Sequence, residues 1–547
     1  MQHPTLAKRV RLLLLIITCA VYLYGLGRAP LLGPDEPRYA QVAREMFVRS
    51  DFVTPTLAGR TWFEKPALLY WLMIAGYTVF GVSEWAARFG VAVAGLLTIF
   101  TTGWLARRVE GAAGEAGMRS FGLAVAAGSA TCAGLIVFAR GASFDVLITA
   151  TVTLALACFF VSEIETEKGK SGRWLVACYA AMGAALLAKG LIGIVLPVGV
   201  IALYYLLQRR RPELFRRGVF WWGPLVTLAV AAMWYAPVTL RHGWIFIDEF
   251  FTQHHFARYV SNKYRHPQPI YFYLPVMLLF TLPWTIFLVA ALSRARRWSW
   301  RGNEAADKLR VFAFAWLVMP VLFFSVSGSK LPGYVLPALP GAALLIGDQL
   351  ARYIRGEGSD RVMRATGALV FLIGSAGLVF AVTTKQLTVA CTLTVGLPAV
   401  AVGAFVLIRA GQQRVASTVS IAGVTLLTVV LLVSCALDVV ARRESVRDLL
   451  RMAEARGYGH VPVVQLHTVE RTAQFYAADR LVYDEQTREP IKYEGVFQVV
   501  NAARQAGGRI LVIVPLEYVT QLTADAALRS EVIGDNGAVA LVAVMVP

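Results

Sequence analysis

Acidic and basic side chains of the kind that handle charged substrates gather in one segment near the start of the chain. Asp35, Glu36 and Arg38 stand almost next to one another, and Glu64 and Lys65 follow in the same segment, which apolar runs flank on both sides. Carboxylates can orient a substrate or accept a proton, and cations can neutralise a negatively charged leaving group. Because charges beside a bilayer are costly to keep, this clustering indicates a functional site.

The same motif also fits an ordinary helix start. In that interpretation Asp35 is the N-cap, Glu36 lies in an acidic first turn and Pro37 stands close to the first helical position. A helix start needs no chemistry. The functional interpretation therefore depends on further charged residues that the topology brings to the same side of the membrane.

Those further residues lie at the ends of predicted membrane spans. Asp145 stands at the outer end of one span, where a helix cap is the structural alternative. Lys189 and Lys330 lie in short turns between apolar runs, where lysines commonly snorkel towards water. Tyr334 follows Lys330 closely, and a cation with a phenol suits a phosphate group at the membrane edge.

The composition indicates a protein that crosses the membrane many times. Of the 547 residues, 57% are hydrophobic and only 16% are charged, unlike the usual composition of soluble domains. The net charge of +19 lies in short basic loops between apolar runs, so the positive-inside rule explains it and no nucleic-acid partner is expected. The six cysteines all fall in apolar segments without paired spacing, and we expect them to be small apolar fillers.

About thirteen apolar segments are long enough to cross about 30 Å of hydrocarbon. They are Arg11–Leu26, Arg88–Ala106, Phe121–Ala139, Val146–Ser162, Trp174–Leu187, Leu191–Leu207, Val219–Leu240, Ile270–Leu292, Leu309–Val326, Val335–Leu350, Thr366–Thr383, Cys391–Ile408 and Thr418–Val440. The first is expected to be an uncleaved span. The basic loops place the N-terminus inside and the C-terminus outside.

One more apolar segment, Ala67–Val82, is predicted not to span. The charged loop before it lies outside, and the basic loop that begins at Arg107 lies inside. An odd number of crossings must separate the two, and Arg88–Ala106 already supplies one. We therefore expect this segment to lie on the outer face, with Tyr70 among its interfacial aromatic residues.

The chain changes character near residue 441. Charged residues become frequent, and the apolar runs Val461–Leu466, Arg509–Pro515 and Val539–Val546 have the length of strands. Helical patterns at Ser445–Ala455 and Val496–Gln505 lie between them. The predicted fold class is an α-helical polytopic membrane protein. Residues 1–440 form the membrane domain, residues 28–87 its first outer loop with juxtamembrane helices, and residues 441–547 an α/β domain on the outer side.

A divalent metal such as zinc is a weaker expectation. The segment from Asp248 to Arg265 contains the adjacent residues His254 and His255, which point about 100° apart on a helix and so do not readily share one ion. His255 together with Glu64 supplies two ligands of suitable type. Two ligands seen in a sequence are weak evidence, and no cofactor is certain.

The motifs resemble those of the polyprenyl-phosphate-sugar-dependent glycosyltransferases of the C-type superfamily, which includes the protein O-mannosyltransferases. They are most similar to those of the bacterial enzymes that transfer aminoarabinose to lipid A. The residues that carry the resemblance are Asp35 to Ala40, Phe63 to Pro66, Tyr70 with Trp71, His255 with Arg258, and Ser329 to Tyr334. The similarity covers the membrane portion and is much less clear for the C-terminal part.

This resemblance implies an inverting transfer of 4-amino-4-deoxy-L-arabinose from undecaprenyl phosphate to a lipid A phosphate, on the periplasmic side of the bacterial inner membrane and among its lipids. The protein is expected to act as a monomer. The expected catalytic residues are Asp35, Glu36 and Asp145. The expected substrate-binding residues are Arg38, Tyr39, Lys65, Tyr70, Lys189, Arg258, Lys330 and Tyr334.

Two alternatives stay open. Within the same superfamily, the enzyme would transfer a mannose or another hexose to a protein or glycan. From a different class, the chain would be a transporter or flippase for a lipid-linked sugar. Transporters tend to show matched halves and ionisable residues at mid-membrane, whereas here the charges gather at the outer rim and no repeat is visible.

Overall fold

A computed structural model describes residues 4–112, 120–165, 168–212, 217–250, 268–384, 387–484, 489–525 and 528–546. The chain divides into two compact units. The helical unit comprises Met1–Tyr24, Phe63–Leu69 and Phe89–Leu432, and the mixed unit comprises Gly25–Trp62, Tyr70–Arg88 and Val433–Pro547. The sequence divides the chain near residue 440, whereas in the structure most of the first outer loop groups with the C-terminal part.

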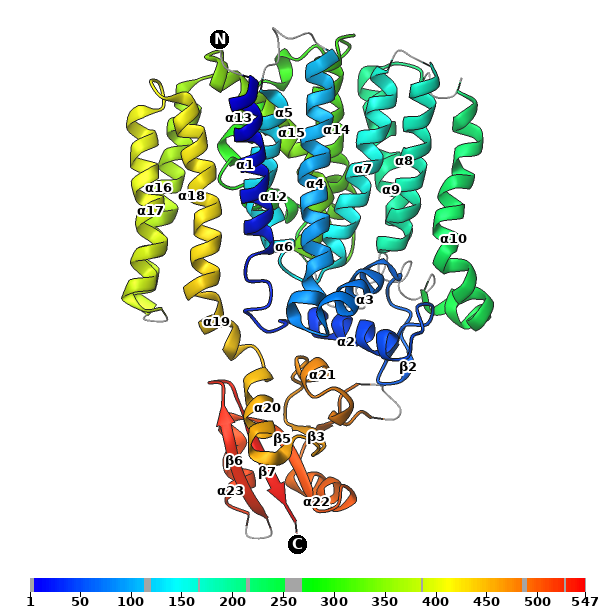
Figure 1. The fold of residues 1–547 in the computed structure, drawn as a ribbon, viewed down its shortest axis with the longest axis vertical. Helices are drawn as coiled ribbons and strands as arrows, with labels where there is room; N and C mark the ends of the chain where they lie inside the picture. Colours follow the sequence, from blue (N-terminus) through cyan, green and yellow to red (C-terminus); the bar gives the residue numbers. More distant parts are fainter. Residues whose placement is uncertain are drawn as a thin grey trace. The chain divides into compact units, whose positions relative to one another are not determined.

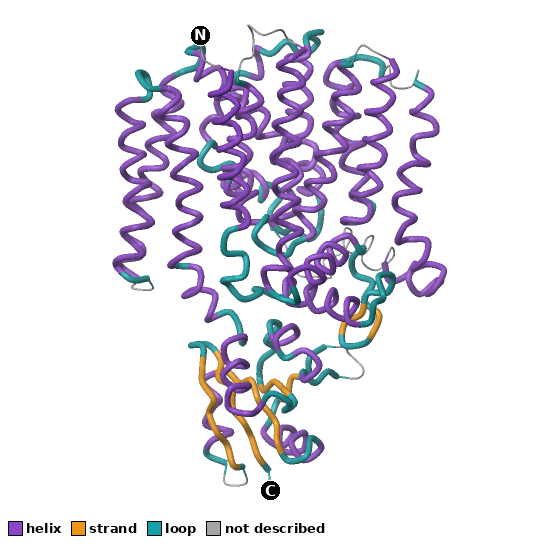
Figure 2. Tube along the Cα trace, viewed as in Figure 1, coloured by secondary structure: helices purple, strands orange, loops and turns teal. Residues whose placement is uncertain are grey.

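The helical unit is built from long helices that run side by side (Figures 1 and 2). Its elements, including two helices that it shares with the mixed unit, are α1 (Pro4–Leu23), α4 (Glu84–Ala112), α5 (Phe121–Thr131), α6 (Ala133–Phe138), α7 (Phe144–Ile164), α8 (Lys168–Lys189), α9 (Ile192–Gln208), α10 (Gly218–Ile247), α12 (Tyr273–Phe280), α13 (Thr285–Ser293), η3 (Ala295–Arg297), α14 (Ala305–Ser325), η4 (Pro332–Ala338), α15 (Leu339–Arg355), α16 (Asp360–Thr384), α17 (Val389–Arg409) and α18 (Arg414–Cys435).

The described part of the chain contains nine helices that are long and apolar enough to cross a membrane. The bent pair α12 and α13 makes a tenth if it counts as one span. The other three predicted spans fall on the shorter apolar helices α1, α5 and α9, so every predicted span contains helix. The protein is therefore a multi-pass membrane protein, and the number of about thirteen crossings stays a prediction.

Two predicted spans are broken rather than continuous. The span predicted over Phe121–Ala139 stops at Cys132, whose backbone is extended, and the span predicted over Ile270–Leu292 bends by 118° between α12 and α13. The two breaks meet, because the Ala133 N–H donates to the Leu282 carbonyl at 2.9 Å. A broken helix is tolerated in a membrane where a neighbour satisfies its backbone in this way.

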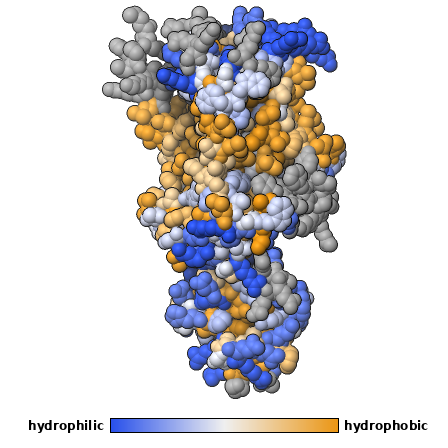
Figure 3. All heavy atoms as spheres, turned by 90° about the vertical axis from the view of Figure 1, so that its right-hand side faces the viewer, coloured by the Kyte–Doolittle hydropathy of each residue, from blue (hydrophilic) through white to orange (hydrophobic). Residues whose placement is uncertain are grey.

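Apolar side chains are exposed on the face of this unit that carries α10. Figure 3 shows apolar side chains over the face that carries α10, with hydrophilic atoms gathered at the end of the helices. On α10 itself, Trp221, Leu225 and Leu240 are exposed by 73%, 65% and 86%. In water such an apolar surface would favour aggregation, whereas in a membrane it is in contact with lipid.

The segment predicted to stay on the outer face forms the short helix α3 (Leu68–Phe80). Its 13 residues span about 20 Å at 1.5 Å per residue, less than the roughly 30 Å of the hydrocarbon core. The length therefore agrees with the expectation that this segment does not cross on its own.

The mixed unit contains a five-stranded sheet with strand order β4-β3-β5-β7-β6. Strands β3, β4 and β5 pair in parallel, whereas β7 pairs antiparallel with both β5 and β6. Its elements, including α3, which begins in the helical unit, are α2 (Asp35–Val48), β1 (Thr56–Leu57), β2 (Arg60–Thr61), α3 (Leu68–Phe80), α19 (Leu437–Arg443), α20 (Arg447–Ala453), η5 (Glu454–Tyr458), β3 (Val463–Leu466), α21 (Ala473–Tyr476), η6 (Ala478–Arg480), β4 (Lys492–Tyr493), α22 (Val496–Gln505), β5 (Arg509–Pro515), η7 (Leu516–Tyr518), α23 (Val519–Thr523), β6 (Arg529–Asp535) and β7 (Val539–Met545).

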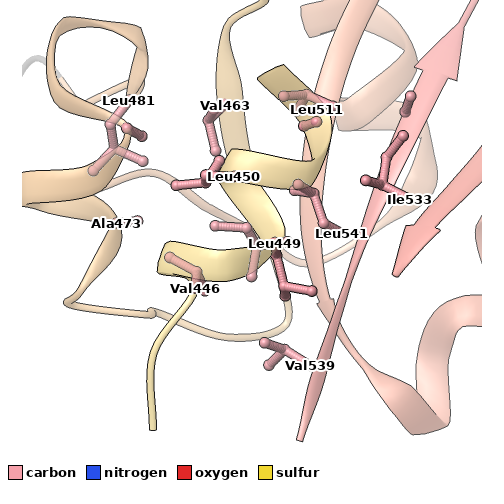
Figure 4. Close-up of a cluster of buried hydrophobic side chains, with 14 residues drawn as sticks. Val446, Leu449, Leu450, Val463, Ala473, Leu481, Leu511, Ile533, Val539 and Leu541 are labelled. Carbon is pink, nitrogen blue, oxygen red and sulfur yellow. The ribbon is translucent and has the colours of Figure 1, made fainter. Parts of the chain in front are cut away.

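Alternation along the strands gives the sheet an apolar core on each face. On one face, Leu511 of β5 and Leu541 of β7 pack with Leu450 of α20 (Figure 4), whereas Val512 of β5 packs with Val499 of α22 on the other. Successive side chains of a strand point to opposite faces, so both faces require a helical cover. The predicted α/β domain is confirmed, with β4 and β6 added at its edges.

The expectation for the cysteines was partly wrong. Cys391, in the first turn of α17, and Cys435, the last residue of α18, are disulfide-bonded. Cys19, Cys132 and Cys158 are free, as is Cys178. The two bonded residues are 44 positions apart in the sequence and sit inside apolar runs, so their spacing carries no disulfide signal of the kind found in small secreted domains.

Candidate active site

Helix α2 presents Asp35 at its first position. The preceding residue, Pro34, occupies the N-cap and makes no side-chain cap bond, so the interpretation of Asp35 as the cap was wrong. Gly33, with φ of 65°, supplies the left-handed turn into the helix that other residues rarely adopt. The Asp35 side chain is 55% exposed, and its ion pair is with Arg38 at 3.2 Å. Its carboxylate is therefore open to a ligand.

Glu36, the next residue, lies in a different environment. Its carboxylate forms a buried ion pair with Arg88, at 2.9 Å and 2.7 Å, and also accepts the Leu32 N–H at 2.8 Å. The Arg88 guanidinium is the counterpart: besides Glu36, it donates to the carbonyls of Leu26, Ala29 and Pro30. All five guanidinium N–H groups are thereby used. These contacts fix the position of Glu36 at the start of α2, and the catalytic role expected of it from the sequence stays a prediction.

The remaining predicted residues of this group lie close to α2. Arg38 is 17% exposed and its guanidinium lies over the Trp62 ring, 5.4 Å from the centroid, an attractive cation–π geometry. Tyr39 packs edge-to-face against Tyr70, with 6.5 Å between ring centroids. Arg38 is thus held with its charge beside Asp35, and the contact between Tyr39 and Tyr70 packs α2 against α3.

The C-terminal part of the mixed unit contacts the segment that precedes Asp35 and the start of α4. The Tyr476 hydroxyl donates to the Glu84 carboxylate at 3.0 Å and accepts the Leu31 N–H at 2.7 Å. Arg447 adds an ion pair with Glu84 at 3.4 Å. Burial, and then the Glu84 carboxylate, raise the pKa of Tyr476 above its usual value, so this phenol stays protonated and able to donate. The segment that precedes Asp35 is therefore tied to the C-terminal part of its own unit.

In the helical unit, a second group forms where α7 begins and α8 ends. Asp145 and Lys189 form an ion pair whose side chains are 17% and 18% exposed, and the Lys189 ammonium lies 4.6 Å from the centre of the Tyr334 ring. Ser143 is the N-cap of α7, accepting the Asp145 N–H at 3.1 Å. The alternative in which Asp145 caps its helix was therefore wrong.

The turn that carries Lys330 closes over this ion pair. Gly333, in η4, approaches Asp145 so closely that a Cβ at position 333 would stand 2.2 Å from its Oδ2 atom. Lys330 is 7% exposed, and its ammonium donates to the carbonyls of Ser327 and Gln268 at 2.7 and 3.1 Å. Two of its three N–H groups are thus fixed within the described residues, and the lysine is held in one orientation.

Glu64 and Lys65 lie in the helical unit and pair with each other at 3.0 Å, with side chains 10% and 12% exposed. The preceding Phe63 packs edge-to-face against the rings of His242 and Phe246, with centroids 5.0 and 5.3 Å away. No group of three or more metal-ligand side chains occurs within the described residues. His255 lies outside the described residues, so a metal held with Glu64 stays a prediction.

The structure thus assembles the predicted residues in two groups. Asp35, Glu36, Arg38, Tyr39 and Tyr70 belong to the mixed unit. The helical unit holds the remaining described residues, which are Asp145, Lys189, Lys330 and Tyr334, together with the Glu64–Lys65 pair. Arg258, like His255, lies outside the described residues. That both groups face one cavity stays a prediction of the sequence.

Sequence reasoning missed four positions that shape these groups: Arg88, Trp62, Ser143 and Gly333. A signal was present for Arg88, because an arginine at the start of an apolar run needs a partner, and Glu36 was available. Ser143 stands two residues before Asp145, near the start of a predicted span, and serine is a common N-cap at a helix start. Nothing in the sequence distinguishes Gly333 from an ordinary turn glycine.

Comparison with known proteins assigns the family. The model of the dolichyl-phosphate-mannose-protein mannosyltransferase family matches residues 9–295, more than half of the 547 residues. The chain belongs to this family. The match covers α1 to α13 and hence most of the predicted site residues, whereas Lys330 and Tyr334 lie beyond it.

Among curated proteins, the chain is similar to two named transferases. One is the undecaprenyl phosphate-alpha-4-amino-4-deoxy-L-arabinose arabinosyl transferase of Edwardsiella ictaluri, 31% identical over 67% of this chain and 63% of the relative. Another, from Aeromonas salmonicida, is 32% identical over 64% of this chain and 62% of the relative. The chain therefore matches somewhat less than two thirds of the length of these relatives.

Solved structures show the fold. ArnT from Cupriavidus metallidurans, bound to undecaprenyl phosphate, matches with a TM-score of 0.77 and 24% identity over 98% of both chains. The archaeal oligosaccharyltransferase AglB from Archaeoglobus fulgidus matches with a TM-score of 0.50 and 12% identity, over 94% of this chain and 70% of that chain. The predicted fold, a C-type glycosyltransferase with a C-terminal α/β domain, is confirmed.

The contrast between Asp35 and Glu36 predicts different effects of the same chemical change. Glu36→Gln leaves Arg88 buried without a full countercharge, which costs roughly 3–5 kcal/mol of stability. Asp35→Asn removes only an exposed ion pair, worth about 0–1 kcal/mol. Thermal unfolding of the purified protein in a neutral detergent should therefore show a large drop in melting temperature for Glu36→Gln alone. Equal melting temperatures for the two variants would contradict the assigned roles.

Proposed function

We propose that this protein is an inverting glycosyltransferase that moves 4-amino-4-deoxy-L-arabinose from undecaprenyl phosphate to a phosphate of lipid A. The observation that carries the proposal is the similarity, at 31–32% identity over about two thirds of the chain, to transferases named for this donor. Membership of a lipid-phosphate-sugar transferase family and the shared fold of ArnT support it.

The reaction exchanges one phosphate for another at the anomeric carbon. An oxygen of the acceptor phosphate forms a bond to that carbon, while the bond to the carrier phosphate breaks and undecaprenyl phosphate leaves with the electron pair. Negative charge therefore develops on the leaving oxygen. Cations held in fixed positions stabilise such charge without having to reorganise during the reaction.

The described residues supply four such cations. Arg38 is oriented by Trp62, while Lys65, Lys189 and Lys330 are each held by the contacts given above. Each has a fixed partner, so each is pre-organised before the substrates bind. We assign them to the phosphates of donor and acceptor, with Tyr334 as a phenolic donor beside Lys189.

Asp35 is assigned an orienting role. A phosphate monoester has its second pKa at about 6, so most of the acceptor is already deprotonated at neutral pH and needs no strong general base. An exposed carboxylate beside Arg38 can then align the sugar or the guanidinium. If the acceptor is instead a hydroxyl, Asp35 becomes the base that removes its proton.

We place the site on the periplasmic side of the inner membrane. The basic loops support this orientation through the positive-inside rule. The bonded Cys391 and Cys435 support it independently, because disulfides persist in oxidising compartments such as the periplasm. Cys391 begins α17 and Cys435 ends α18, at the ends that the predicted topology puts outside.

A second candidate function is transfer of a mannose or another hexose to protein or glycan. The matched family carries the description of a protein mannosyltransferase, which favours it over transport. The two transfer reactions differ in the acceptor, and hence in whether a general base is required.

The reaction is tested by reconstituting the full chain with undecaprenyl-phosphate-linked aminoarabinose and lipid A and weighing the lipid products. We expect a lipid A product heavier by one aminoarabinose residue. Asp35→Asn should retain a substantial part of this transfer if Asp35 orients, and should abolish it if Asp35 is an obligate base. A preparation that modifies only a protein or glycan hydroxyl, from a hexose donor, would contradict the proposal.

The close approach of Gly333 to Asp145 predicts a strong effect of one added methyl group. Gly333→Ala forces the carboxylate away from Lys189, and a misplacement of about 1 Å in a catalytic site can cost about 100-fold in rate. Gly377→Ala, in α16 where an added Cβ meets nothing within 4 Å, is the matched control. Turnover of the two variants under saturating substrates measures the difference, and equal rates would show that Asp145 is not needed in its present position.

The orientation predicts which side of the membrane reaches Cys435. After mild reduction, this half-buried thiol should react with a membrane-impermeant maleimide in spheroplasts but not in inverted vesicles. The experiment uses a Cys19→Ser background, because Cys19 is a free and partly exposed cysteine. In that background Cys435→Ser should remove the label, since Cys132, Cys158 and Cys178 are buried and Cys391 is only 4% exposed. Labelling confined to inverted vesicles would place Cys435 on the cytoplasmic side and contradict the predicted topology.

A further inference from the structure

A basic cavity lies within the helical unit, at the ends of three of its helices. It has a volume of about 250 Å³ and is lined by residues that follow α13, begin α14 and end α15. Its charged lining residues are Arg294, Arg297, Asp307, Arg310, Asp348 and Arg352. A water molecule takes up about 30 Å³ of liquid, so the cavity has room for a polyatomic group.

Two of the arginines are neutralised inside the cavity. Arg310 pairs with Asp307 at 2.8 Å and with Asp348 at 3.4 Å. Arg352 pairs with Asp348 at 3.2 Å. The positive charges of these two arginines are thus matched by the negative charges of the two aspartates.

The other two lining arginines are not paired with a carboxylate among the described residues. Arg294 donates to the neutral amide oxygen of Gln349 at 3.1 Å. Among the described residues, the Arg297 side chain has no carboxylate within ion-pair distance. The Gln349 amide is fixed in turn by a bond to Asp348 at 3.3 Å. The lining therefore carries about two positive charges in excess of its carboxylates.

The helix termini do not cancel this excess. Helices α13 and α15 end here and contribute about half a negative charge each, whereas α14 begins here and contributes about half a positive charge. Their sum is about half a negative charge, which is smaller than the excess of the arginines. The cavity remains a site for an anion.

The residues around the cavity are of the kind found where lipid headgroups meet the acyl chains. The rings of Trp298 and Trp300 pack with each other and with Phe314, with centroids 5.4 to 6.1 Å apart, and aromatic belts of this kind mark the membrane interface. On α13, less than two turns before Arg294, Val289 is 49% exposed and offers apolar surface to an acyl chain.

We propose that this cavity binds the phosphate headgroup of an anionic membrane lipid. Arg294 and Arg297 contact the phosphate, Trp298 lies at the headgroup level and α13 supports the acyl chain. The cavity is separate from every residue assigned to the transfer reaction, so the proposal does not rest on that function. Basic pockets between membrane helices commonly take lipid headgroups in this manner.

The test uses two neighbouring arginines of η3. Both are exposed, but Arg297 lines the cavity and Arg296 does not. The purified full chain in neutral detergent is titrated with phosphatidylglycerol, and the rise in melting temperature gives an apparent dissociation constant. We expect Arg297→Gln and Arg294→Gln each to weaken binding about fivefold, since an arginine near an anionic surface contributes about that factor. Arg296→Gln should stay close to wild type.

Further comparisons distinguish a lipid phosphate from a soluble anion. Arg297→Lys, which keeps the charge, should bind phosphatidylglycerol better than Arg297→Gln, and this comparison stays informative even if the neutral variant is poorly folded. Phosphatidylcholine and inorganic phosphate should stabilise the protein far less. The proposal is overturned if Arg296→Gln weakens binding as much as Arg297→Gln does. It is also overturned if phosphatidylcholine binds equally well, or if inorganic phosphate alone gives the full stabilisation, which would indicate a soluble anion.

Discussion

The buried ion pair between Arg88 and Glu36 is the constraint on which the mixed unit's part of the site depends. Removing two charges from water is expensive, and only near-complete hydrogen bonding repays that cost. Arg88 meets this condition with two bonds to Glu36 and three to backbone carbonyls of residues 26–30. One side chain thus fixes the start of α2 and the loop that leads to it, and Asp35 takes its place at the helix start as a consequence.

This arrangement separates the roles of carboxylates that look alike in the sequence. Successive residues of a helix point about 100° apart, so when Glu36 turns inward to Arg88, Asp35 must point elsewhere, and its side chain is 55% exposed. Asp145 represents an intermediate case, since it pairs with Lys189 but keeps 17% of its side chain exposed. Exposure and the number of fixed partners therefore distinguish a residue that holds the fold from one that can meet a substrate.

The sequence predicted what depends on pattern and missed what depends on local geometry. Hydrophobic length located helix in every predicted span, and short apolar runs located β5 and β7 almost to the residue. The breaks at Cys132 and at Thr281–Trp284 were not foreseen, because a broken span has the same composition as a continuous one and differs only in which neighbour satisfies its backbone. The disulfide-bonded state of Cys391 and Cys435 was missed for a related reason: both cysteines are placed by helix ends, and sequence spacing does not report on those.

The arginines of this protein show how the same side chain comes to serve either structure or binding. Arg88 directs all five donors to protein acceptors, one of which is a carboxylate, and has no capacity left for a ligand. Arg294 has one neutral partner, and Arg297 lines the same cavity without a carboxylate among the described residues. Positive charge alone therefore does not identify a binding site in a chain with a net charge of +19. The deciding quantity is the number of donors and charges that remain after the protein's own acceptors are counted, and this number can be read from a structure but not from a sequence.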